Sequence, residues 1–206
     1  MNQVAAASDK SGLTQHVLQL VRGRRTRSFA RARLRRRDEV ILDTETTDLF
    51  GEVIQVSVID LAGHVLLSTL VRAHLPIAPE AAAVHGIRDV DLAAAPPLTE
   101  ISQQLLEVTR GRVLLAYNAP YDRRVLTHDL VSAGVDPAHL ADQANWACLM
   151  RARAAVDGGP WTALNGPHHA LGDCYATLDV LHGLAGRRLS APREHVGPDP
   201  TPQPAV

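Results

Sequence analysis

Two acidic side chains stand two positions apart at the end of an apolar stretch. The segment EVILDTETT, residues 39–47, places Asp43 and then Glu45 after three apolar residues. Burying an ionised carboxylate is unfavourable unless a positive charge accompanies it. The pair therefore belongs either to a polar turn at the end of a strand or to a site that binds a cation.

Two aspartates elsewhere in the chain are expected to reach the same place. Asp122 ends the segment AYNAPYD and lies in the first turn of a predicted helix. Asp173 lies in HHALGDC, near the start of the last predicted helix. Because ligands of open α/β sheets bind beyond strand ends and near helix starts, the sequence predicts that both aspartates approach Asp43 and Glu45.

Four carboxylates in one place would require cations, because each close pair repels by about 4 kcal/mol at an effective dielectric constant of about 20. Ligand sets made only of oxygen favour Mg²⁺ or Mn²⁺ over zinc. Two such ions about 4 Å apart activate water and stabilise charge on the attacking and leaving oxygens of a phosphodiester. The pattern therefore indicates metal-dependent phosphodiester hydrolysis.

The elements that would position these residues alternate between strands and helices. Predicted strands cover residues 39–44, 52–61, 64–73, 112–118 and 144–150, and predicted helices cover residues 79–87, 98–111, 120–134 and 169–187. Three consecutive strands followed by alternating helices and strands indicate a mixed sheet with helices on its faces, which is an α/β layer fold.

The N-terminal segment is strongly basic. Residues 1–37 carry Lys10 and nine arginines against Asp9, although the net charge of the whole chain is −1. We expect an arm with one short helix, residues 12–21, that ends at Gly23. A basic arm on an acidic domain favours a polyanionic partner such as nucleic acid. A solvated tail that aids solubility and a transit peptide are the alternatives.

Composition also indicates the organisation and the compartment. Residues 190–206 are rich in proline and are predicted to be disordered, which leaves one domain over residues 38–189. Cys148 and Cys174 are too few for a disulfide scaffold and show no C-x-x-C spacing, so a reducing cytoplasm is expected. No apolar run approaches the roughly 18 residues of a membrane-spanning helix.

Three segments in this order, LDTETT, AYNAPYD and HHALGD, resemble the three motifs of the DEDD exonuclease superfamily. They are most similar to its histidine-bearing branch, DEDDh, which includes ribonuclease T and the proofreading epsilon subunit of bacterial replicative polymerases. The segment VHGI, residues 84–87, also matches that branch, and the resemblance covers roughly residues 38–188. It implies a ribonuclease H-like fold, with five strands in the order 3-2-1-4-5 and the first three antiparallel.

The resemblance also implies roles for individual residues. Asp43, Glu45 and Asp173 would hold the ion that binds the nucleophilic water. Asp43 would bridge to a second ion, which Asp122 supports directly or through water. The residues implied to hold the 3′-terminal nucleotide are Thr44, Thr46, His85 and Asn118.

The general base depends on how two neighbouring histidines are assigned. Regular helical spacing would pair His169 with Asp173, four positions away. The family pattern H-x-A-L-x-D instead selects His168. Helical spacing and the family pattern agree if His168 lies just outside the helix. Gly166 and Pro167, which precede it, favour this position. We therefore expect His168 to be the base.

Two residues and one segment depart from the family pattern. Tyr121 stands where phenylalanine is usual, and Tyr117 replaces a common histidine. Only residues 151–167 separate Met150 from the third motif, where many relatives carry an additional helix. We expect this shortening to open one side of the site and to affect substrate range.

The resulting hypothesis is a 3′–5′ exonuclease that uses two Mg²⁺ or Mn²⁺ ions and releases nucleoside monophosphates. DNA is favoured as the substrate by analogy with proofreading relatives, with a polymerase as a further candidate partner. An exoribonuclease of the same family is one alternative, because no residue pattern indicates recognition of the 2′-hydroxyl. A nucleic-acid-binding or scaffold protein without catalytic activity is the alternative from another class.

Overall fold

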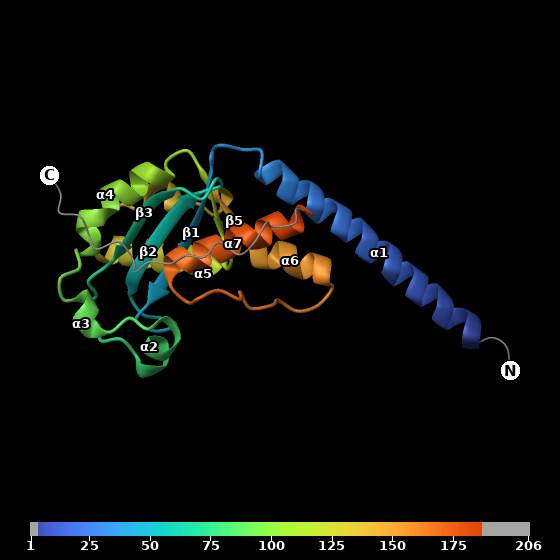
Figure 1. Cartoon of the computed structure of the whole chain (residues 1–206), viewed down its shortest axis with the longest axis horizontal. Helices are drawn as coiled ribbons and strands as arrows, with labels where there is room; N and C mark the ends of the chain where they lie inside the picture. Colours follow the sequence, from blue (N-terminus) through green and yellow to red (C-terminus); the bar gives the residue numbers. More distant parts are fainter. Residues whose placement is uncertain (1–3, 187–206) are drawn as a thin grey trace.

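The computed structural model describes residues 4–186 of the chain, and side chains from residue 19 onward. The centre of the protein is a five-stranded sheet in the order β3-β2-β1-β4-β5 (Figure 1). The strands are β1 (Glu39–Thr46), β2 (Val53–Asp60), β3 (Val65–Leu70), β4 (Val113–Ala116) and β5 (Trp146–Cys148). β1, β2 and β3 pair antiparallel, whereas β4 is parallel to β1 and to β5. The predicted mixed sheet and its strand order are confirmed.

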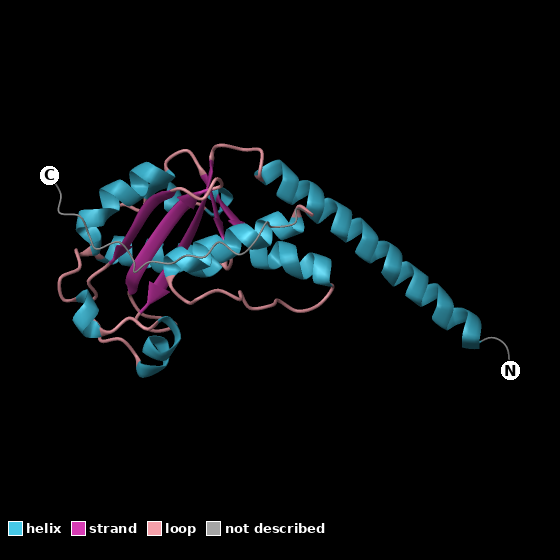
Figure 2. Cartoon of the chain, viewed as in Figure 1, coloured by secondary structure: helices cyan, strands magenta, loops and turns pink. Residues whose placement is uncertain are grey.

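Helices cover both faces of the sheet, as Figure 2 shows. They are α1 (Val4–Arg33), α2 (Pro79–His85), α3 (Asp89–Leu92), α4 (Leu98–Thr109), α5 (Ala119–Ser132), α6 (Leu149–Asp157) and α7 (Ala170–Leu184), with 3-10 turns at Ala138–Leu140 and Gln143–Asn145. Within residues 4–186, no helix is long and apolar enough to cross a membrane.

The central strand β1 packs against a different helical layer on each face. Successive side chains of a strand point to opposite sides, so Val40 and Leu42 face the layer of α4 and α5, and Ile41 faces α7. The same alternation continues into the motif. Asp43 therefore lies on the face that α7 covers, and Thr44 lies on the face that α5 covers.

Two helices, α3 and α6, were not predicted from the sequence. α3 was missed because it is a single turn of four residues, which is too short to show a helical hydrophobic pattern. β5 spans only three residues, where we expected a strand over residues 144–150, and α6 begins directly after it. α6 continues through residues 151–157 at the beginning of the segment before the third motif, which we expected to be shortened compared with relatives that carry an additional helix there.

α1 is one continuous helix, whereas we expected a shorter helix that ends at Gly23. A glycine inside a helix costs only about 1 kcal/mol relative to alanine. Contacts with the domain offset this cost, because Ala30 in the following turns is completely buried. The first part of α1 projects away from the sheet (Figure 1), and the predicted tail, residues 190–206, lies outside the described residues.

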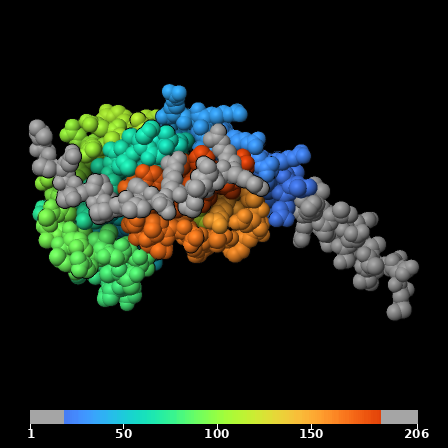
Figure 3. All heavy atoms as spheres, in the orientation of Figure 1, coloured from blue at the N-terminus to red at the C-terminus, as the bar shows by residue number. Residues whose placement is uncertain are grey.

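The second part of α1 is fastened to the domain. Phe29 packs against the apolar cluster under α7. Arg31 Nε donates a hydrogen bond to the carbonyl of Ala185, 3.0 Å away, at the end of α7. Arg33 forms an ion pair of 2.8 Å with Glu39, whose side chain is buried at the start of β1. Figure 3 shows this part of α1 in contact with α6 and α7.

Candidate active site

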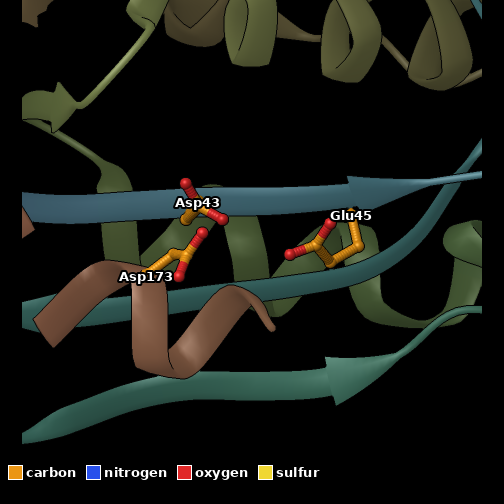
Figure 4. A group of neighbouring side chains, drawn as sticks. All are labelled: Asp43, Glu45 and Asp173. Carbon is orange, nitrogen blue, oxygen red and sulfur yellow. The ribbon is translucent and has the colours of Figure 1, made fainter. Parts of the chain in front are cut away.

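Three carboxylates meet between the end of β1 and the first turn of α7. Asp43 and Glu45 lie on the same face of β1, and α7 carries Asp173 over that face. One oxygen from each of the three lies within 4.8 Å of the others. Figure 4 shows the carboxyl groups directed into a common space. Residues 130 positions apart in the chain are thus brought together as the sequence predicted.

The start of α7 is fixed by hydrogen bonds that set the position of Asp173. The ring nitrogen Nδ1 of His169 accepts a hydrogen bond from the backbone N–H of Gly172 at 3.0 Å, so His169 caps the helix. The buried side chain of Gln55, in β2, accepts a hydrogen bond from the N–H of Ala170 at 2.9 Å. These bonds satisfy N–H groups that a helix start leaves without partners.

The loop before α7 also contacts the cluster. The backbone N–H of His168 donates to Oδ1 of Asp173 at 3.2 Å. His168 lies outside α7, is exposed, and has a positive φ of 57°, which is uncommon for a residue with a side chain. Helical spacing and the family pattern were expected to agree if His168 lay just outside the helix. The structure shows this arrangement, because His168 precedes α7 and His169 is its N-cap.

Burial and mutual repulsion disfavour the charged forms of these carboxylates. Burial raises the pKa of Asp43 well above its usual range, and repulsion from the neighbouring carboxylates adds to this effect. Burial, and then repulsion from Asp173 and Asp122, raises the pKa of Glu45 to about 8. Burial also raises the pKa of Asp173. A divalent cation would relieve this repulsion, and the oxygen ligands fit Mg²⁺ or Mn²⁺.

The fourth predicted carboxylate, Asp122, lies beside the other three. It is 3% exposed in the first turn of α5, and its Oδ1 accepts a hydrogen bond of 2.9 Å from the hydroxyl of Thr44. Burial raises the pKa of Asp122 to about 7, although the bond from Thr44 opposes this rise. Asp122 is close enough to repel Asp43 but does not belong to the group of three oxygens within 4.8 Å.

The hydroxyl of Thr46 is engaged within the protein. It donates to the carbonyl of Asp48 at 2.6 Å, so its lone pair accepts the hydroxyl proton of Tyr121 at 2.7 Å. Tyr121 thus makes a bond that the phenylalanine usual at this position could not make. The bond ties the end of β1 to α5 next to Asp122.

Tyr117, the second departure from the family pattern, holds the loop before α7. Its hydroxyl donates to the carbonyl of Thr162 at 2.5 Å and accepts a bond of 3.4 Å from Arg153 of α6. The loop that carries His168 is therefore joined to the end of β4.

The remaining two predicted substrate residues present polar groups near the end of β1. His85 ends α2, and its Nδ1 accepts a bond of 3.0 Å from the N–H of Ile87. Its Nε2 is buried and has no hydrogen-bond partner within residues 19–186. Burial lowers the pKa of His85, and the carbonyl of Thr46 beside it opposes this effect. Asn118 is exposed at the N-cap of α5, with no capping bond from its side chain.

Two features that shape the site were not identified from the sequence: the capping role of Gln55 and the close approach of Gly166 to Asp173. Gln55 is a polar residue within the apolar strand VIQVSV, and that contrast is the signal that could have identified it. Gly166 approaches Asp173 so closely that a Cβ on the glycine would lie 2.0 Å from Oδ1. Such an approach depends on tertiary packing and leaves no local pattern in the sequence.

This fold and this acidic cluster define a nuclease, and the chain belongs to the exonuclease family. The family model described as Exonuclease matches residues 40–181, which include all four carboxylates. The ribonuclease H-like fold implied by the sequence motifs is confirmed by the observed sheet order and by the fold of exonucleases of known structure.

Individual relatives agree with this assignment. The chain is 31% identical over 171 residues to the uncharacterized exonuclease CP81 of Escherichia phage 186, which covers 72% of this chain and 88% of that protein. It is 30% identical over 176 residues to the DNA polymerase III subunit epsilon of Rickettsia conorii, covering 74% and 76% of the two chains. A structure of Exonuclease X in complex with 5′ overhanging duplex DNA has a TM-score of 0.52 and 28% identity, over 72% of this chain and 93% of that chain.

Proposed function

We propose that this protein is a divalent-metal-dependent 3′–5′ exonuclease that releases nucleoside monophosphates from DNA. The observation that carries the proposal is the approach of Asp43, Glu45 and Asp173 to within 4.8 Å. Burying three carboxylates together, with raised pKa values, is unfavourable without a cation. The solved complex of Exonuclease X with DNA supports DNA as the substrate.

The four carboxylates would divide between two ions. Asp43, Glu45 and Asp173 would hold the first, and Asp122 would support the second together with Asp43. Two Mg²⁺ or Mn²⁺ ions bound there would activate water and stabilise charge on the oxygens of the reacting phosphodiester. The hydrogen bond of 2.9 Å from Thr44 fixes the orientation of the Asp122 carboxyl group.

His168 would be the general base that takes a proton from the attacking water. Its backbone N–H donates a hydrogen bond of 3.2 Å to Asp173, which places this residue at the cluster, whereas the Nδ1 atom of His169 is engaged in capping α7. Histidine is the side chain that most often accepts a proton in general-base catalysis.

The 3′-terminal nucleotide would lie against the end of β1. The hydroxyls of Thr44 and Thr46 are engaged within the protein, so their backbone groups would contact the nucleotide. The ring of His85 and the amide of Asn118 would supply further hydrogen bonds, because His85 lies beside Thr46 and the side chain of Asn118 makes no capping bond. Such contacts would recognise the 3′ end of a nucleic-acid strand and not its base sequence.

A degradation assay tests the proposal. A 5′-labelled single-stranded 20-nucleotide DNA and an RNA of the same sequence are incubated with protein and Mg²⁺, and again with EDTA. We expect Mg²⁺-dependent shortening from the 3′ end, faster on DNA, and none with Asp43→Asn. Faster shortening of the RNA would overturn the substrate assignment. Binding without nucleotide release would instead favour the scaffold alternative.

A further inference from the structure

A groove runs along the open edge of the sheet beside the candidate active site. Its volume is about 730 Å³, and it lies between α1, the first turn of α5, β5 and the start of α6. β5 is an edge strand, so no further strand covers this side of it. The groove therefore exists only because α1, which lies outside the part matched by the family model, forms one of its walls.

Arginines from three separate elements line this groove. Arg25 and Arg33 come from α1, Arg123 from α5 and Arg151 from α6, and the described residues that line the groove include no acidic side chain. Arg33 is paired with Glu39. Arg25 and Arg151 form no ion pair or hydrogen bond within residues 19–186, and Arg123 donates one bond of 3.1 Å to a carbonyl. The groove thus carries net positive charge that the protein itself does not neutralise.

One wall of the groove is the first turn of α5, which also carries the candidate metal ligand Asp122. Arg123 directly follows Asp122 in α5, and a helix turns about 100° per residue, so the two side chains leave α5 in different directions. Ala119 and Pro120, at the start of α5, also line the groove.

Aromatic rings accompany the positive charge. Phe29 and Trp146 line the groove, and the guanidinium of Arg33 lies 5.0 Å from the centre of the Phe29 ring. Grooves that bind single-stranded nucleic acid combine basic residues along the backbone with aromatic rings near the bases. The composition of this groove matches that chemistry better than it matches an apolar protein partner.

We propose that this groove binds the sugar–phosphate backbone of the single strand whose 3′ end occupies the active site. This rests on the proposed function. Because the groove is lined by the turn of α5 that carries Asp122 but by none of the four carboxylates, it would contact phosphates upstream of the scissile one. The N-terminal arm and the exonuclease domain thereby form one substrate surface, in which Arg25 and Arg151 contact phosphate.

Binding of a labelled single-stranded 20-nucleotide DNA is measured by anisotropy in EDTA, over a range of salt concentrations. We expect Arg25→Gln combined with Arg151→Gln to raise the Kd roughly 10-fold and to reduce the salt slope by about 1.4, which corresponds to two phosphate contacts on a single strand. The matched control, Arg24→Gln with Arg110→Gln, removes the same charge from exposed positions outside the groove. Equal losses in both double variants would overturn the proposal.

A second readout separates the groove from the catalytic site. With Mg²⁺, hydrolysis of a thymidine dinucleotide, whose only phosphate is the scissile one, should be unchanged in the Arg25→Gln/Arg151→Gln variant. The KM for the 20-nucleotide strand should rise at unchanged kcat. An equal loss on both substrates would also overturn the proposal. If the unmodified protein degrades neither substrate, the proposed function fails, and the anisotropy comparison still tests the groove.

Discussion

Gly166 lies directly against Asp173, since a Cβ added to the glycine would stand 2.0 Å from Oδ1 of the aspartate. The absence of a side chain at this position lets the loop approach the carboxylate. The N–H of His168, two residues later, donates to the same oxygen at 3.2 Å. One glycine thereby sets both the position of a candidate metal ligand and that of the candidate base.

Gly166→Ala should therefore reduce the exonuclease rate about 100-fold, because a displacement of about 1 Å at a reacting centre can have an effect of this size. The control is Gly159→Ala in the same loop, where nothing lies within 4 Å of an added Cβ. Rates are compared under saturating Mg²⁺, and melting temperatures verify that both variants fold. Equal rates in the two variants would refute the positioning role of Gly166.

Thr44→Val keeps the shape of the side chain but removes the hydrogen bond to the buried carboxylate of Asp122. Leaving a buried acceptor without its partner costs about 1–3 kcal/mol of stability. The pKa of Asp122 should rise further, because the bond from Thr44 now lowers it. We expect the rising limb of the pH–rate profile to move to higher pH, whereas Thr69→Val in β3, away from the site, should leave the profile in place.

We expect His168 to have a catalytic role and His169 to have a structural one. His168→Ala should lower the rate 10²- to 10⁴-fold, the range typical of a lost general base, with little effect on melting, because His168 is exposed. His169→Ala should instead cost about 1 kcal/mol of stability through loss of the N-cap and change the rate only a few-fold. The opposite pattern would assign the base to His169.

Stability without metal should depend on pH through the crowded carboxylates. Burial raises the pKa of Glu45 from 4.5 to about 8 and that of Asp122 from 3.8 to about 7. At a pH between the unfolded and the folded pKa of each group, the folded protein binds more protons than the unfolded chain. Its free energy of unfolding therefore falls as the pH rises. In EDTA the melting temperature should therefore fall from about pH 5 to pH 8.

Metal should counteract this loss, because an ion that binds only the folded state stabilises it. We expect the increase in melting temperature produced by Mg²⁺ or Mn²⁺ to be small at pH 5 and larger at pH 8. Asp43→Asn should weaken this increase at the higher pH. A metal-induced increase that does not change with pH would be inconsistent with raised carboxylate pKa values.

The mixed sheet and the approach of the acidic residues could be predicted from local patterns, whereas the strand order was implied by the family resemblance. Apolar residues before Asp43 identified the central strand, and the alternation of β1 set the face on which Glu45 joins it. Asp173 was predictable from its place at a helix start. These features depend on strand period and helix boundaries, both of which are encoded within a few residues.

The remaining features depend on tertiary contacts that no local pattern encodes. Gly23 was expected to end a helix, but packing of Ala30 on the domain makes α1 continuous. The hydrogen bond between Thr44 and Asp122 joins residues 78 positions apart. The arginine groove combines α1 with β5 and two further helices, so it could be recognised only after the chain was folded.

The most direct test of the account is calorimetric titration of Mn²⁺ into the protein and into Asp173→Asn, with Asp179→Asn in the same helix as the control. We predict that Asp173→Asn weakens binding of the tightest ion at least 10-fold, that Asp179→Asn leaves it unchanged, and that the rate on DNA falls in parallel. Equal Mn²⁺ affinity in all three proteins would contradict the claim that β1 and α7 together form a metal centre.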